Sequence, residues 1–236
     1  MAVYITYLMN LFIPRSGEIS RALVVNKYEN VPFDKAFGTI ISERVADFII
    51  LLLFIATTLL LQYQLITDYL LESIDLFKIY ILIGVAVPIV FLFFYFLKKS
   101  NSTLSMKIKT FLLGLKEGIL SIFKMEKKWA FIGHTVFIWA MYVIMFYLMI
   151  FALDETSQIS FAAIITAFVV GSITIAFTNG GFGSYPFFIA GILLLFGVPE
   201  TAGTAFGWLV WTSQTVMVII LGGLSFLLLP VLNKAK

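Results

Sequence analysis

The residues best suited to chemistry are charged side chains that lie within or beside long apolar runs. Arg15, Glu18 and Arg21 follow one another at intervals of three, so on one helix they would share a face. Pro14 fits the first turn of such a helix. A guanidinium donates two parallel hydrogen bonds, which suits it to a phosphate group or to a carboxylate. The segment therefore predicts a helix with one charged face.

A second charged group interrupts the apolar run 37–62. It contains Glu43, Arg44 and Asp47, and the two acids are four residues apart on one predicted helix face. An ionised side chain at bilayer depth costs at least about 2.5 kcal/mol, so such residues pair or serve a function. Two interpretations stay open: a neutral salt-bridge network that locks two helices together, or arginines that hold a phosphate-bearing headgroup while the acids orient them or meet a cationic group.

A glycine-rich segment is the third feature, with three glycines in four residues and Pro186 soon after them. This composition predicts a broken helix inside the hydrophobic region, where freed backbone is tolerated only if it is buried in protein or lines a wet cavity. The amides that begin the following helix would make an anion site there. A plain cytoplasmic turn between two spans is the alternative. The candidate residues are Asn179, Gly180, Gly181 and Gly183.

The elements that position these residues are membrane helices. The chain has 236 residues, of which 61% are hydrophobic and only 12% are charged, against roughly 25% charged residues in soluble proteins. It has no cysteine and one histidine, which excludes disulfides, thiolate nucleophiles and histidine clusters. We predict an all-α, polytopic integral membrane helical bundle, a single transmembrane domain over 1–236. The apolar runs are 37–62, 76–97, 129–153, 159–177, 185–198 and 204–229.

A transmembrane helix needs about 20 residues, and three of the apolar segments are shorter than this. Residues 159–177 fall just below this length, and 185–198 suit a half-helix. Together these two are either two full spans or the arms of a re-entrant hairpin. Met1 to Ile13 is too short to span, and we expect it to be the tail of a helix whose beginning is absent or unusually short.

The distribution of Lys and Arg predicts the orientation. The connection 98–128 carries eight lysines, whereas the connections 62–75, 154–158 and 199–203 carry six acids and no basic residue. We therefore place the basic connections and the C-terminus on the cytoplasmic side of the inner cell membrane. Apolar residues recur every three to four positions at about 102–124, which predicts an amphipathic helix. Its lysines would face anionic headgroups, or the helix would pack on the protein's own loops.

The three groups of residues together resemble the lysylphosphatidylglycerol synthase transmembrane family, which is flippase-like. The strings that carry the resemblance are Asn10-x3-Pro14-Arg15-x-Gly17-Glu18-x2-Arg21, Glu43-Arg44-x2-Asp47 and Gly180-Gly-x-Gly183. The resemblance implies a helical domain that binds and translocates lipids, in some members aminoacylated phosphatidylglycerol. It also implies that Arg15, Glu18, Arg21, Glu43, Arg44, Asp47, Gly180, Gly181 and Gly183 line the lipid path.

Two expectations follow from comparing the chain with that family. Its members usually have one or two more helices before the first motif, so we expect the chain to be N-terminally short. No aminoacyltransferase domain follows Lys236, so we expect no synthase activity from this chain.

The leading hypothesis is a flippase-like, lipid-binding transport domain for a phosphate-bearing lipid, either aminoacylated phosphatidylglycerol or another anionic or isoprenoid lipid. The alternative is a membrane anchor or scaffold subunit for a separately encoded lipid- or glycan-modifying enzyme. An intramembrane enzyme ranks last, because the sequence offers no nucleophile–base pair and no metal-ligand set. We expect no cofactor, no metal and no nucleic-acid partner. The expected partner is membrane phospholipid, and a homo-oligomer is compatible with the sequence.

Overall fold

The computed structural model describes residues 1–64, 88, 99, 105–106, 109, 113, 120, 122–178 and 180–233. The chain groups into two compact units. One unit comprises Met1–Thr58 and Trp129–Lys236, and the other comprises Leu59–Lys128. The first unit contains every candidate site residue. The predicted span 76–97 and most of the predicted amphipathic helix 102–124 lie outside the described residues.

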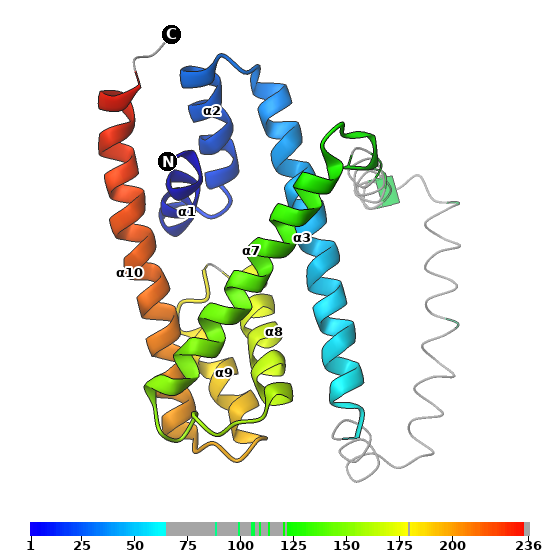
Figure 1. The fold of residues 1–236 in the computed structure, drawn as a ribbon, viewed down its shortest axis with the longest axis vertical. Coiled ribbons are helices and arrows are strands. Elements are labelled where there is room, and N and C mark those ends of the chain that lie inside the picture. The colour runs from blue at the N-terminus through cyan, green and yellow to red at the C-terminus, as the bar shows by residue number, and fades with distance from the viewer. Residues whose placement is uncertain are drawn as a thin grey trace. The chain divides into compact units, whose positions relative to one another are not determined.

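The described part of the chain is helical and contains no strand, which confirms the predicted all-α class. Figure 1 shows the course of the chain. Its elements are α1 (Ala2–Phe12), α2 (Gly17–Glu29), α3 (Phe33–Leu61), α7 (Lys128–Met149), the 3-10 turn η1 (Ile150–Ala152), α8 (Phe161–Phe177), α9 (Ser184–Leu194) and α10 (Glu200–Leu232).

Among the described residues, three helical segments are long and apolar enough to cross a membrane, namely Phe33–Leu61, Lys128–Ala152 and Glu200–Leu232. They coincide with three of the predicted apolar runs. At about 1.5 Å per residue, even the shortest of them exceeds the roughly 30 Å hydrocarbon core. The protein is therefore a multi-pass membrane protein.

Helices α1 and α2 form a tight hairpin, because side chains of the turn satisfy its backbone. Asn10 Oδ1 accepts a hydrogen bond from the Gly17 amide at 2.8 Å, and Ser16 Oγ donates to the Met9 and Ile13 carbonyls at 3.1 and 2.8 Å. A Cβ atom at Gly17 would collide with the Thr6 carbonyl oxygen. Glycine at this position thus permits the close contact of the two helices.

Helices α8 and α9 form a second hairpin around the glycine-rich segment. Ser160 caps α8 by accepting a hydrogen bond from the Ala163 amide at 3.2 Å. Helix α8 has 17 residues and α9 has 11, so they extend only about 25 and 16 Å. These lengths favour the re-entrant hairpin over two full spans.

Helix α10 supports both hairpins through close contacts at glycine. A Cβ atom at Gly207 would lie 2.5 Å from Pro186 Cα in α9, and one at Gly222 would lie 2.7 Å from Leu8 Cβ in α1. Glycine at these two positions thus permits close helix packing, whereas Gly223 faces open space. The two hairpins thus lie against different parts of α10 (Figure 1).

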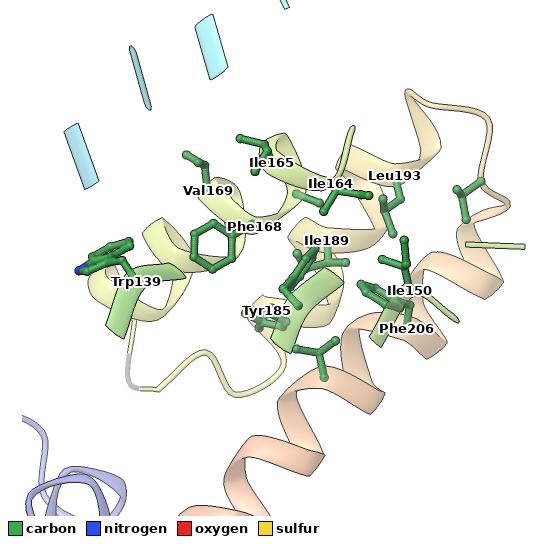
Figure 2. Packing of buried hydrophobic residues seen from close by; sticks show 14 residues of the cluster. Trp139, Ile150, Ile164, Ile165, Phe168, Val169, Tyr185, Ile189, Leu193 and Phe206 are labelled. Carbon is green, nitrogen blue, oxygen red and sulfur yellow. The ribbon is translucent and has the colours of Figure 1, made fainter. Parts of the chain in front are cut away.

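The main core lies around α8 and α9 and is built from aromatic and branched aliphatic side chains (Figure 2). Phe146 contacts both Phe168 and Phe206 edge to face, at centroid distances of 5.9 and 5.4 Å. Trp139 lies at the border of this core and packs edge to face on Phe168 at 6.3 Å. The core therefore fixes the position of one indole that also contacts the charged residues of α3.

Candidate functional site

Arg21 and Glu43 form a two-point ion pair between α2 and α3. Arg21 Nη1 lies 2.5 Å from Glu43 Oε2, and Nη2 donates to Oε1 at 2.9 Å. The side chains are only 21% and 31% exposed, and the neighbouring Ala22 is buried in a cluster with Ala36 and Ile40 of α3. The donors of this guanidinium that face Glu43 are occupied, so the pair joins two helices and does not present an open cation.

Arg44 and Asp47 form a much looser pair within α3. One contact joins them, from Arg44 Nη2 to Asp47 Oδ2 at 3.4 Å, and the Arg44 side chain is 51% exposed. A guanidinium carries five N–H donors in a planar fork. Among the described residues, Arg44 has no other recorded ion-pair partner, so most of its donors remain open to another anion.

Asp47 is held from the other side by Trp139 of α7. The indole Nε1–H donates to Asp47 Oδ1 at 3.0 Å, so the two carboxylate oxygens have different partners. Tyr142 packs edge to face on Trp139 at 6.2 Å and lies within electrostatic range of Arg44 and Asp47. Its hydroxyl is 3.0 Å from the hydroxyl of Tyr7 in α1. These five residues form a polar cluster that joins α1, α3 and α7.

Arg15 lies outside the helix on which the sequence placed it. Helix α2 begins at Gly17, and Arg15 occupies the preceding turn with a φ of 62°. The prediction that Arg15, Glu18 and Arg21 share one helical face with Pro14 in its first turn is therefore wrong. The reason is the Asn10–Gly17 contact, which reverses the chain before α2 can begin. A positive φ is uncommon for a residue with a side chain and is often found at functional positions.

Glu18 lies in the first turn of α2, and its Oε2 is buried without a hydrogen-bond partner. Among the residues that the structure describes, no ion pair joins Glu18 or Arg15 to an oppositely charged side chain. The six charged candidates therefore comprise two ion pairs and two side chains outside them. Glu43 pairs with Arg21 on another helix and not with its neighbour Arg44.

The glycine-rich segment joins α8 to α9 through three residues with positive φ. The values are 68° at Gly180, 77° at Gly181 and 70° at Gly183, which favour glycine at each position. Trp211 Nε1 of α10 donates to the Gly180 carbonyl at 2.7 Å, and the Gly181 amide donates to Thr178 Oγ1 at 3.1 Å. The predicted helix break is confirmed. Asn179 lies outside the described residues.

The amides that follow the break have no recorded acceptor. Within the described segments, no hydrogen bond leaves the backbone N–H of Phe182, Gly183 or Ser184. Phe182 itself is 72% exposed and packs edge to face on Trp211 at 5.4 Å. Free amides at a helix start, next to an exposed side chain, can donate hydrogen bonds to an anionic group.

Trp211 also sets the position of the break along α10. It lies 11 residues beyond Glu200, the first residue of that helix (211 − 200), which corresponds to about 17 Å along the axis. Since α10 has 33 residues, the break lies beside the helix and not at its end. This position disfavours a plain turn at the membrane surface.

Sequence reasoning missed the two tryptophans that contact the candidate motifs. Trp139 and Trp211 each donate the indole N–H to a candidate residue. A signal was available, because an indole N–H in apolar surroundings requires an acceptor.

Comparison with protein families gives one result that covers most of the chain. A family model described as "Lysylphosphatidylglycerol synthase TM region" matches residues 1–223. The matched region includes both hairpins, the charged residues of α3 and the break. Comparison with curated proteins and with solved structures found no match.

Proposed function

The chain belongs to the lysylphosphatidylglycerol synthase TM region family, and we propose that it binds a phosphate-bearing lipid and moves it between the leaflets of the cell membrane. Membership relates the chain to lipid modification or lipid flipping in a membrane. The proposed lipid carries a phosphate group, with aminoacylated phosphatidylglycerol and isoprenoid phosphates as the two chemical classes to compare.

The observation that carries the proposal is the open guanidinium of Arg44. An arginine within an apolar span is costly unless it is paired or used. Arg21 is paired at two points, whereas Arg44 has a single 3.4 Å contact and a half-exposed side chain. A planar, weakly hydrated guanidinium suits a phosphate better than an ammonium does. We therefore assign the headgroup contact to Arg44 and a structural role to Arg21.

The glycine break supplies the second part of the proposed path. Its amides without a recorded acceptor among the described residues, together with the positive end of α9, favour a negative group. The break lies about 17 Å along α10, deep enough to meet a headgroup that has left the interface. Both short hairpins give the bundle partly inserted elements, which a membrane tolerates only around protein or wet cavities.

Arg15 is the proposed second basic contact. It is exposed in the turn between α1 and α2, and no recorded ion pair neutralises it among the described residues. We place the basic connections and the C-terminus in the cytoplasm on the Lys/Arg distribution, so this turn would receive lipid from the inner leaflet. The chain itself would bind and move lipid without chemical conversion.

The test is photocrosslinking of a lipid probe to the full chain in detergent–lipid micelles. A photoactivatable phosphatidylglycerol should label the protein, and an otherwise identical diacylglycerol probe, which lacks the phosphate, should label it weakly. Arg44→Gln should lower labelling by phosphatidylglycerol about tenfold, and Arg15→Gln should lower it less. Equal labelling of wild type and Arg44→Gln would contradict the headgroup site.

The scaffold function keeps one specific support, which is the family description itself. It names the transmembrane region of a synthase, and such a region can also anchor or hold an enzyme. If neither probe labels the protein, while an enzyme of lipid or glycan modification copurifies with it, the scaffold function replaces the proposal.

A further inference from the structure

We infer that Trp139 is a positioning residue that keeps Arg44 available to a phosphate by holding one oxygen of Asp47, an inference that rests on the proposed function. Trp139 lies on α7, and no motif or comparison assigns it a role. Its side chain is 9% exposed, so it acts through Asp47 and does not itself contact a headgroup.

The two arginine–carboxylate pairs of the site provide the contrast. Glu43 accepts from no indole among the described residues, and it binds Arg21 through both oxygens. Asp47 Oδ1 accepts from Trp139 at 3.0 Å, and only Oδ2 faces Arg44, at 3.4 Å. Arginine and carboxylate frequently pair at two points when both oxygens are free. Trp139 therefore prevents Asp47 from closing over Arg44 as Glu43 closes over Arg21.

Rings on three sides fix the indole in the orientation that this role requires. Phe54 of α3 stacks on it at 5.6 Å, Phe168 of α8 meets it edge to face at 6.3 Å, and Tyr142 lies at 6.2 Å. Figure 2 shows Trp139 beside Phe168 at the edge of the core. A side chain held in this way cannot follow Asp47 if the carboxylate turns toward Arg44.

Trp139→Phe should turn the carboxylate toward Arg44 and weaken labelling by the phosphatidylglycerol probe about tenfold, which equals about 1.4 kcal/mol. Replacing Trp139 with 3-benzothienylalanine should have the same effect. This residue keeps the two-ring shape and carries sulfur in place of the N–H group. The matched control is Trp129→Phe, since Trp129 lies on the same helix, is 77% exposed and makes no recorded indole hydrogen bond in the described part. This control should label as wild type does.

The decisive variant is Trp139→Phe combined with Asp47→Asn. If Trp139 acts by restraining the Asp47 carboxylate, Asp47→Asn removes the negative charge that would otherwise close over Arg44. The double variant should then label to within about twofold of wild type. If Trp139 only packs the core, the second substitution should add to the loss, and the inference is overturned. The inference is also overturned if the benzothienyl variant labels as wild type does.

The two proposals fail in different ways. Unchanged labelling in Arg44→Gln contradicts the headgroup site and with it the role of Trp139. Reduced labelling in Arg44→Gln, together with wild-type labelling in Trp139→Phe, contradicts the positioning role alone. The benzothienyl variant preserves the test if Trp139→Phe fails to fold, because it fills the same space.

Discussion

The Arg21–Glu43 pair predicts a large difference in stability between two arginine substitutions that look alike in the sequence. Arg21→Gln removes the partner of a carboxylate that is only 31% exposed and leaves its charge in apolar surroundings. Arg44→Gln removes a side chain that is half exposed and makes a single 3.4 Å contact. The first change should destabilise the protein, and the second should leave its stability nearly unchanged.

The structure sets the magnitude of each effect. Breaking a fully buried ion pair costs roughly 3–5 kcal/mol. The Arg21 and Glu43 side chains are 21% and 31% exposed, so solvent partly screens the pair. We therefore reduce the expected loss of stability to about 2–3 kcal/mol. For a chain of this size, the loss corresponds to a fall in Tm of about 4–12 °C. The exposed Arg44 pair contributes roughly 0–1 kcal/mol, which corresponds to a fall of no more than about 4 °C.

The assay is thermal unfolding of the purified protein in detergent, followed by circular dichroism at the helical band. The exchanged variant Arg21→Glu with Glu43→Arg serves as the control, and it should recover most of the lost Tm because it restores the pair with reversed polarity. Equal Tm values for Arg21→Gln and Arg44→Gln would refute the distinction between a locking pair and an open arginine. Failure of the exchange would show that the loss came from packing.

Three further predictions concern backbone, packing and orientation. Gly181→Ala should lower Tm more than Gly180→Ala. Both positions have a positive φ, but only a Cβ atom at position 181 would meet neighbouring atoms, at 3.0–3.5 Å. Equal Tm values for the two variants would contradict this prediction. Gly207→Ala should destabilise by about 1–3 kcal/mol, measured by the same unfolding, since its Cβ atom would enter α9. The chain has no cysteine, so single cysteines at Glu155 and Lys127 report sidedness cleanly. An impermeant thiol reagent should label position 155 and not 127 in intact cells, and the reverse pattern would overturn the predicted orientation.

The sequence predicted the long helices and the break because their causes are local. Apolar length specifies a span, and three glycines before a proline cannot continue a helix. The pairing of charges was not predictable in the same way. Helical spacing shows which residues share a face of one helix, but the partner of Glu43 lies on α2 and depends on how α2 packs against α3.

The position of Arg15 shows the same limit at a turn. The three-residue spacing of the charges suggested one helix. Instead, the hydrogen bond between Gly17 and Asn10 closes a turn between α1 and α2, and α2 begins at Gly17, two residues after Arg15. Trp139 illustrates the limit across the bundle, since Asp47 and Trp139 are 92 residues apart in the chain. Only the packing of α3 against α7 brings these two side chains together.

The measurement that tests the proposed function most directly is lipid movement in liposomes that contain the purified full chain. The probe is phosphatidylglycerol with a nitrobenzoxadiazole label on one acyl chain, and dithionite added outside bleaches the label in the outer leaflet. In liposomes with wild-type protein, the inner-leaflet probe should be bleached faster than in protein-free liposomes. Arg44→Gln should abolish most of this increase in bleaching rate. The proposed function would be contradicted if the probe in wild-type liposomes were bleached at the protein-free rate. It would also be contradicted if Arg44→Gln increased the bleaching rate as much as wild type does.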